Sequence, residues 1–151
     1  MTITLQAIKA EHNKVAEMIA AFEKQATSEY RIAGGTIQLN PGERYAGLIL
    51  GKDGEPDHHL ILLPGDEAEL NWDDAKKWAK EQGGELPSRR EQSLLYANLK
   101  DEFQGTWYWS GEAHERESGW AWYQTFYGGC QLNGHQTSEL RARAVRRLIL
   151  L

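Results

Sequence analysis

The N-terminal part of the chain carries apolar side chains at alternating steps of three and four residues. This spacing is that of the a and d positions of a heptad repeat, and Thr4 stands where a helix N-cap is expected. The pattern predicts a helix over residues 4–27. The helix either packs on its own domain as an amphipathic helix or joins two or three copies of the chain as a coiled coil. The positions of the stripe are Leu5, Ile8, His12, Val15, Ile19, Phe22 and Ala26.

Beyond residue 34 the apolar positions form short runs separated by turn residues. The runs TIQL, YAGLIL and HHLILL are bounded by NPGE, GKDGEPD and PGDE. Such runs predict strands, and the second and third form a hairpin around residues 52–54. Neighbouring residues on a strand point to opposite faces, so His58 and His59 cannot share a metal ion and are interpreted as strand residues.

Two helices with clear boundary signals follow. Asn71 is a suitable cap for WDDAKKWAKEQ, which ends at a pair of glycines. Ser88 and Glu91 have the spacing of a capping box at the start of the next helix. The apolar positions of the first helix place Trp72 and Trp78 in the core.

The remainder, residues 106–151, is predicted to form antiparallel strands from TWYWSG, GWAWYQTFY and RARAVRRLIL. Alternation within the strands separates their aromatic side chains into two faces. We assign Trp109, Trp122 and Phe126 to the core. Gln124 is either a buried hydrogen-bonding residue or the floor of a groove. The aromatic residues expected to be exposed are Tyr123, Tyr127 and one of Trp107 and Trp120.

Three separated motifs resemble the C-type-lectin-like fold. NWDDAKKWAKEQGGELPSRREQ is similar to its two-helix segment, and YWSGE, AWYQTFYGG and RAVR are similar to the late strands of the Lcl C-terminal-domain-like family of bacterial and phage or prophage proteins. The resemblance covers about residues 45–148. It implies an α+β fold in which two helices pack against short antiparallel sheets. We therefore expect an N-terminal helix over residues 1–30 and a C-type-lectin-like domain over residues 31–151.

The chain departs from two branches of that fold. Calcium-dependent sugar-binding lectins carry Glu-Pro-Asn or Gln-Pro-Asp and Trp-Asn-Asp in the late loops, whereas the EPD of this chain, residues 55–57, lies in the early hairpin. Formylglycine-generating enzymes share the broader fold and contain a redox pair of cysteines or a copper site built from them. This chain has a single cysteine, Cys130. We expect neither a calcium-bridged sugar site nor any other metal or cofactor.

Composition narrows the partners and the location. The net charge is −5, which argues against a general nucleic-acid binder, although RARAVRR is locally basic. The sequence begins without the pattern of a secretory signal, and no run approaches the ~18 apolar residues of a membrane span. We expect no membrane partner and a location in the host cytoplasm or in a virion.

Enzyme chemistry has weak support in the sequence. Glu112, Glu115 and Glu117 surround His114, but alternating charges between two strands are typical of a solvated loop. HERE does not have the spacing of the zinc-binding His-Glu-x-x-His motif. We expect no catalytic residue and no enzymatic activity.

These observations favour a binding module of phage or prophage type that recognises a protein or a cell-surface ligand through residues 107–141. Exposed aromatic side chains beside amides and charges are typical of recognition surfaces. The alternatives are a structural virion component, a small intracellular effector that binds a host protein and, last, an enzyme related to formylglycine-generating proteins. The candidate binding residues are Trp107, Trp120, Tyr123, Gln124, Tyr127, Gln131, Asn133, His135, Gln136 and Arg141.

Overall fold

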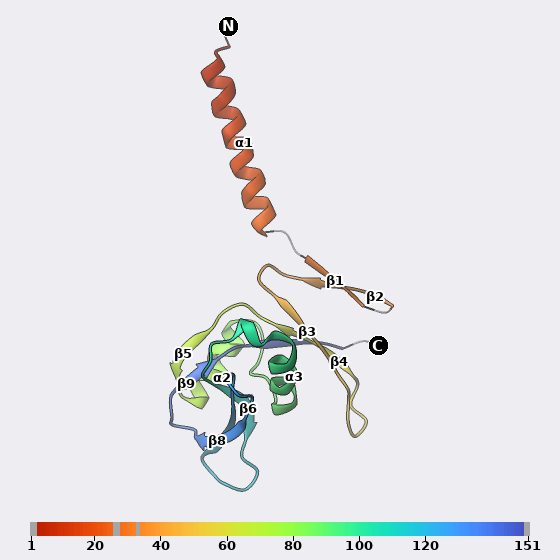
Figure 1. Cartoon of the computed structure of the whole chain (residues 1–151), viewed down its shortest axis with the longest axis vertical. Coiled ribbons are helices and arrows are strands. Elements are labelled where there is room, and N and C mark those ends of the chain that lie inside the picture. The colour runs from red at the N-terminus through yellow and green to blue at the C-terminus, as the bar shows by residue number, and fades with distance from the viewer. Residues whose placement is uncertain (1–2, 26–27, 33, 150–151) are drawn as a thin grey trace. The chain divides into compact units, whose positions relative to one another are not determined.

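The structure, a computed structural model, describes residues 3–25, 28–32 and 34–149. Its described part is α+β, as predicted, with mainly antiparallel sheets and an N-terminal helix (Figure 1). The chain divides into two compact units, residues 1–41 and 42–151. The first unit contains a hairpin in addition to the helix and so extends beyond the boundary expected at residue 30.

The first unit contains helix α1 (Leu5–Gln25) and the hairpin of β1 (Ser28–Ile32) and β2 (Gly35–Leu39). The amide of Ala7 donates to Oγ1 of Thr4 at 3.1 Å, which confirms the predicted N-cap. Strand β2 was predicted, but β1 was not. Its sequence, SEYRI, is exposed over four of its five residues and lacks a buried alternate face. Ala26, the last predicted position of the apolar stripe, lies outside the described residues.

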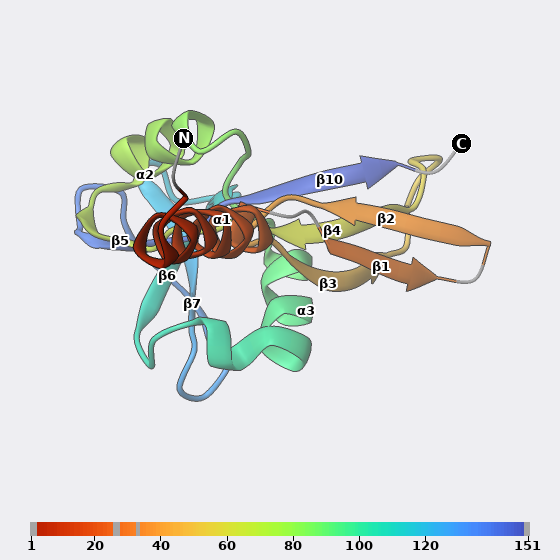
Figure 2. The ribbon, with the colours of Figure 1, turned by 90° about the horizontal axis from the view of Figure 1, so that it is seen from above.

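The second unit contains a three-stranded sheet in the order β10-β4-β3, all antiparallel. Figure 2 shows these strands, β3 (Arg44–Ile49), β4 (His58–Leu62) and β10 (Val145–Ile149), side by side. The predicted hairpin is confirmed, because Ile49 pairs with His58 across the loop. Side chains of β4 are buried along nearly its whole length, as expected for a central strand.

A second sheet of this unit has the order β5-β9-β6-β7-β8. Its strands were predicted to be antiparallel, which is wrong for one pair, because β6 and β9 run parallel. The predicted strand RARAVRRLIL is divided here between two sheets, with β9 in the five-stranded sheet and β10 in the other. Between them the buried guanidinium of Arg143 donates to the carbonyls of Glu102 and Leu63, and the carbonyl of Ala144 accepts from the amide of Leu63. These bonds fix the crossing. The strands are β5 (Glu67–Leu70), β6 (Trp107–Ala113), β7 (Trp120–Thr125), β8 (Gln131–His135) and β9 (Leu140–Ala142).

Two helices flank the five-stranded sheet. Helix α2 (Trp72–Glu81) contributes Trp72 to a cluster that includes Trp109 and Tyr123. Helix α3 (Arg89–Leu99) contributes Leu95 to a second cluster that includes Tyr108 and Phe126. Because Tyr108 and Trp109 are neighbours on β6, the two helices cover opposite faces of the sheet. A short 3₁₀ turn, residues Lys100–Glu102, follows α3.

Candidate functional site

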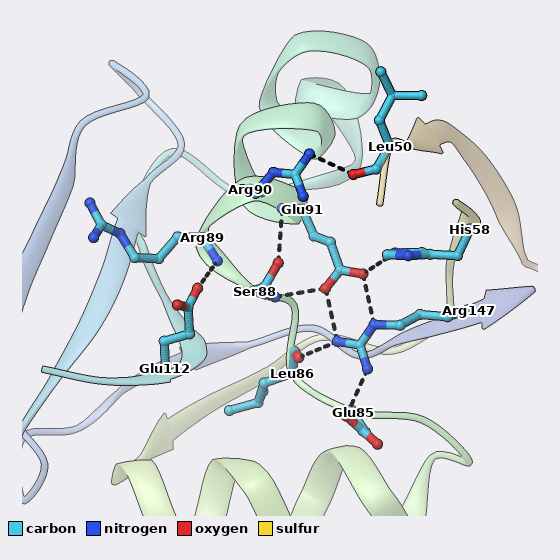
Figure 3. Close-up of polar contacts among 10 residues, drawn as sticks. All are labelled: Leu50, His58, Glu85, Leu86, Ser88, Arg89, Arg90, Glu91, Glu112 and Arg147. Atoms are coloured by element: carbon cyan, nitrogen blue, oxygen red, sulfur yellow. Dashed lines mark hydrogen bonds and ion pairs between the residues drawn. The ribbon is translucent and has the colours of Figure 1, made fainter. Parts of the chain in front are cut away.

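A buried carboxylate, that of Glu91, joins the first turn of α3 to β10 (Figure 3). Its side chain is 1% exposed. Arg147 donates to it from Nε at 2.7 Å and from Nη2 at 2.8 Å, and the Ser88 amide donates at 2.8 Å. Nε2 of His58 lies 2.8 Å from the same carboxylate. The capping box predicted from Ser88 and Glu91 is confirmed, and it doubles as part of this cluster.

Glu91 and Arg147 each stabilise the charged form of the other. Burial alone would raise the pKa of Glu91, but the hydrogen bonds from Arg147 and Ser88 and the positive charge of Arg147 outweigh it and lower the pKa to about 2. The Glu91 hydrogen bonds raise the pKa of Arg147 above its usual value. Glu91 is therefore ionised near neutral pH and has no proton to donate. The arrangement is suited to holding α3 and β10 together.

A groove of about 850 Å³ lies beside this cluster, lined by Arg89, Arg90, Glu112 and Gln131 among others. Several of its charged groups are hydrogen-bonded to the backbone of the chain. The Arg89 amide donates to the Glu112 carboxylate at 2.6 Å, and Nη2 of Arg90 donates to the Leu50 carbonyl at 2.8 Å (Figure 3). The positive end of helix α3 is thus already satisfied by a carboxylate from the chain itself.

The side chain of Trp122 is held between the start of helix α3 and the loop that follows β6. The guanidinium of Arg89 lies 3.6 Å from the centre of its ring, and the His114 ring stacks on it at 5.3 Å. Its Nε1 donates to Glu115 at 3.2 Å. The expectation that Trp122 belongs to the core is therefore wrong, because the ring is only half-buried and the α3 terminus and the 114–119 loop supply its contacts.

Gln124 is a buried hydrogen-bonding residue, one of the two roles predicted for it. Its Nε2 donates to the Gln92 carbonyl at 3.0 Å, and its Oε1 accepts from Gln131 at 2.9 Å. Gln131 in turn accepts from Nε of Arg89 and donates to the Arg89 carbonyl. Gln124 is 1% exposed and so is unavailable to a large partner, whereas Gln131 lies at the groove.

A second group of predicted residues is the aromatic patch, which comprises Trp107, Tyr123 and Tyr127. Trp107 begins β6, Tyr123 lies in β7, and Tyr127 follows the end of β7. Trp107 is 42% and Tyr127 60% exposed, as expected. Nε1 of Trp107 donates to the Tyr127 hydroxyl at 3.3 Å, and its ring stacks on Tyr123 with centroids 5.3 Å apart. Tyr123 itself is 9% exposed, which contradicts its predicted exposure. The rings of Trp107 and Trp109 cover it from two sides.

A second groove, of about 550 Å³, adjoins this patch. Trp107 lines it together with Gln104, Glu139, Arg141 and Glu69. Nε of Arg141 donates to Asp66 at 2.8 Å, which fixes the guanidinium at the groove wall. Glu69 has a φ of 57°, a left-handed conformation that is uncommon for a residue with a side chain and that tends to occur at functional sites.

The remaining predicted residues form a third group at the far end of β7 and β8. The rings of Trp120 and His135 lie 4.1 Å apart, and Nε2 of Gln136 donates to the Trp120 carbonyl at 3.0 Å. Asn133 pairs with Trp122 across the two strands. Trp120 is half-buried. The structure therefore distributes the ten predicted residues over three places and does not gather them on one surface.

The sequence analysis did not predict several residues of these sites. Arg147, His58 and Arg89 meet their partners across long separations in the chain, for example 56 residues between Arg147 and Glu91. Glu69 carried no signal, because its left-handed conformation appears only in the fold. Within the described residues, no group of three or more histidine, cysteine or acidic side chains is arranged to hold a metal ion.

Comparison with known proteins gives no match, either to a protein-family model or to a curated protein. No helix in the part of the chain that the structure describes is long and apolar enough to span a bilayer.

Proposed function

We propose that the chain is a non-enzymatic binding module of phage or prophage type with a C-type-lectin-like second unit. It recognises a protein or cell-surface ligand through the aromatic patch and the adjoining groove. The observation that carries this proposal is the pair of exposed rings, Trp107 and Tyr127, held in place by their mutual hydrogen bond and by the stack on Tyr123.

Rigid aromatic side chains favour binding because they offer a large contact area and lose little side-chain freedom. The stack on Tyr123 orders Trp107 before any partner arrives. Around it, Gln104, Glu139 and Arg141 supply hydrogen-bonding groups to the groove. An apolar centre with a polar rim is the usual composition of a recognition surface.

The chemistry of the other groove supports a role without catalysis. Its buried acid, Glu91, has a pKa of about 2 and is committed to Arg147, so it is a poor proton donor. The carboxylate of Glu112 is occupied by the Arg89 amide. These groups serve the packing of α3 against the sheets.

The test is capture of a partner on the immobilised full chain from extracts of host cells and from disrupted virions. The variant Trp107→Ala/Tyr127→Ala is expected to lose capture at least tenfold. The matched control is Leu48→Ala/Leu50→Ala, because these side chains on and after β3 are comparably exposed, at 43% and 60%. Equal loss in both variants, or undiminished capture by the aromatic variant, would place the binding site elsewhere. The identity of the captured protein separates a cell-surface ligand from a virion or defence protein.

A further inference from the structure

The apolar stripe of α1 is open along the whole described helix. Its apolar a and d side chains are 51–72% exposed, and Met18 beside them is 64% exposed. An exposed apolar stripe of this length is energetically costly in water, since burial of each side chain of this size stabilises a protein by about 1.5–3 kcal/mol. The members are Leu5, Ile8, Val15, Ile19 and Phe22, with His12 as the one polar position in the described seam.

The spacing of the stripe fits a partner helix of the same kind. Steps of three and four average 3.5 residues, the period that keeps a seam facing another helix in a left-handed supercoil. Leucine at an a position with isoleucine at a d position favours three or four strands over two. Leu5 and Ile8 form such a pair, and Val15 is a second β-branched residue at d.

The flanking positions fit a parallel arrangement of three helices. In parallel register the g side chain of one heptad faces the e side chain of the next heptad on a neighbouring copy. The resulting pairs are Thr4 with Lys9, Glu11 with Ala16 and Met18 with Glu23, and none of them brings like charges together. Four strands would bury e and g positions further, at a cost for the charges of Lys9, Glu11 and Glu23.

We propose that the occupant of the α1 stripe is two further copies of this chain, in a parallel three-stranded coiled coil. His12 forms the polar layer of its seam. A single polar a position fixes the register and the number of strands at some cost in stability. The assembly does not depend on the binding function proposed above. One consequence of the assembly does rest on that function: three tethered aromatic patches would bind a multivalent surface with greater avidity than one.

Light scattering on the full chain tests the assembly. The expected mass is three times the 17.2 kDa of the chain. Ile8→Lys/Val15→Lys, which places charges in the seam, is expected to yield monomers. The matched control Gln6→Lys/Asn13→Lys carries the same charges seven residues apart at b positions and is expected to remain trimeric. All six tryptophans lie between residues 72 and 122, so unchanged fluorescence shows that the second unit stays folded.

Two further variants test the layer and the direction. His12→Leu is expected to lower the concentration at which the trimer dissociates at least tenfold. Leu5→Cys in a Cys130→Ser background is expected to form disulfide-linked dimers within the trimer, because parallel helices bring equal a positions together. A monomeric or dimeric wild type, a trimer that survives Ile8→Lys/Val15→Lys, or the absence of Leu5→Cys cross-links in an intact assembly would each overturn the proposal.

Discussion

The guanidinium of Arg147 grips the carboxylate of Glu91 with two parallel hydrogen bonds, Nε to Oε2 at 2.7 Å and Nη2 to Oε1 at 2.8 Å. The pair joins helix α3 to β10, the last strand of the three-stranded sheet. Glu91 is almost fully buried, whereas about a third of the Arg147 side chain is exposed. A pair of this kind contributes little net stability as a whole, but the loss of one partner leaves an uncompensated charge in the interior.

Removal of Arg147 is therefore expected to destabilise the protein more than removal of both partners. We expect Arg147→Met to lower the free energy of unfolding by about 3 kcal/mol, and Glu91→Leu/Arg147→Met by less. Urea unfolding followed by tryptophan fluorescence measures both. Arg44→Met is the control, since its ion pair with Glu102 is exposed and should change stability by about 1 kcal/mol or less. A single variant no worse than the double would refute the interpretation.

The same carboxylate makes stability depend on pH. Folding lowers the pKa of Glu91 from its usual 4.5 to about 2. The folded state thus binds fewer protons than the unfolded state in this range, and the stabilisation is complete above about pH 4.5 and is lost as the pH falls towards 2. The difference corresponds to about 3 kcal/mol. Unfolding measured at intervals from pH 6 to pH 2 checks it, and Glu91→Gln should show a shallower decline over the same range. Parallel curves for the two proteins would assign the pH dependence to other groups.

Local signals predicted the helices correctly. The carboxamide of Asn71 accepts from the Asp74 amide, and the hydroxyl of Ser88 accepts from the Glu91 amide, both at the predicted caps. Such caps involve residues three apart, so they can be predicted from the sequence. The division of residues 140–149 between two sheets could not be predicted, because it depends on the contact of Arg143 with Leu63, 80 residues earlier.

The alternation expected from the sequence failed in β7 for a physical reason. A strand with one solvated face separates exposed from buried side chains, but β7 is covered by α2 on one face and by α3 on the other. Both Tyr123 and Gln124 are consequently buried. Side chains are exposed again beyond the part of the sheet that the helices cover, at Trp107 and Tyr127. The sequence alone shows the two faces of the strand but not how far each helix extends over them.

Trp107 and Trp109 share a face of β6 yet should differ widely in their effect on stability. Trp109 is fully buried, and its Nε1 donates to the Leu70 carbonyl, so Trp109→Ala is expected to cost about 3–5 kcal/mol. Trp107 is 42% exposed, and Trp107→Ala should cost about 1 kcal/mol. Thermal or urea unfolding distinguishes the two. A large loss of stability in Trp107→Ala would show that the aromatic patch serves packing and would weaken its proposed role in binding.

The contact between Arg89 and Trp122 should be measurable as a coupling energy. The guanidinium lies 3.6 Å from the ring centre, and Glu115 lies near both partners, with Arg89 at 3.7 Å and Trp122 at 3.2 Å. A double-mutant cycle of Arg89→Ala and Trp122→Ala is expected to give a coupling of about 1 kcal/mol. The same cycle on Lys100 and Tyr96, 5.3 Å apart, is the control and should give less. Since Trp122 also anchors the 114–119 loop through His114 and Glu115, amide exchange in that loop should accelerate in Trp122→Ala. A coupling near zero would mean that Gln131 and Glu115 hold the Arg89 side chain and that the Trp122 ring lies beside it without energetic consequence.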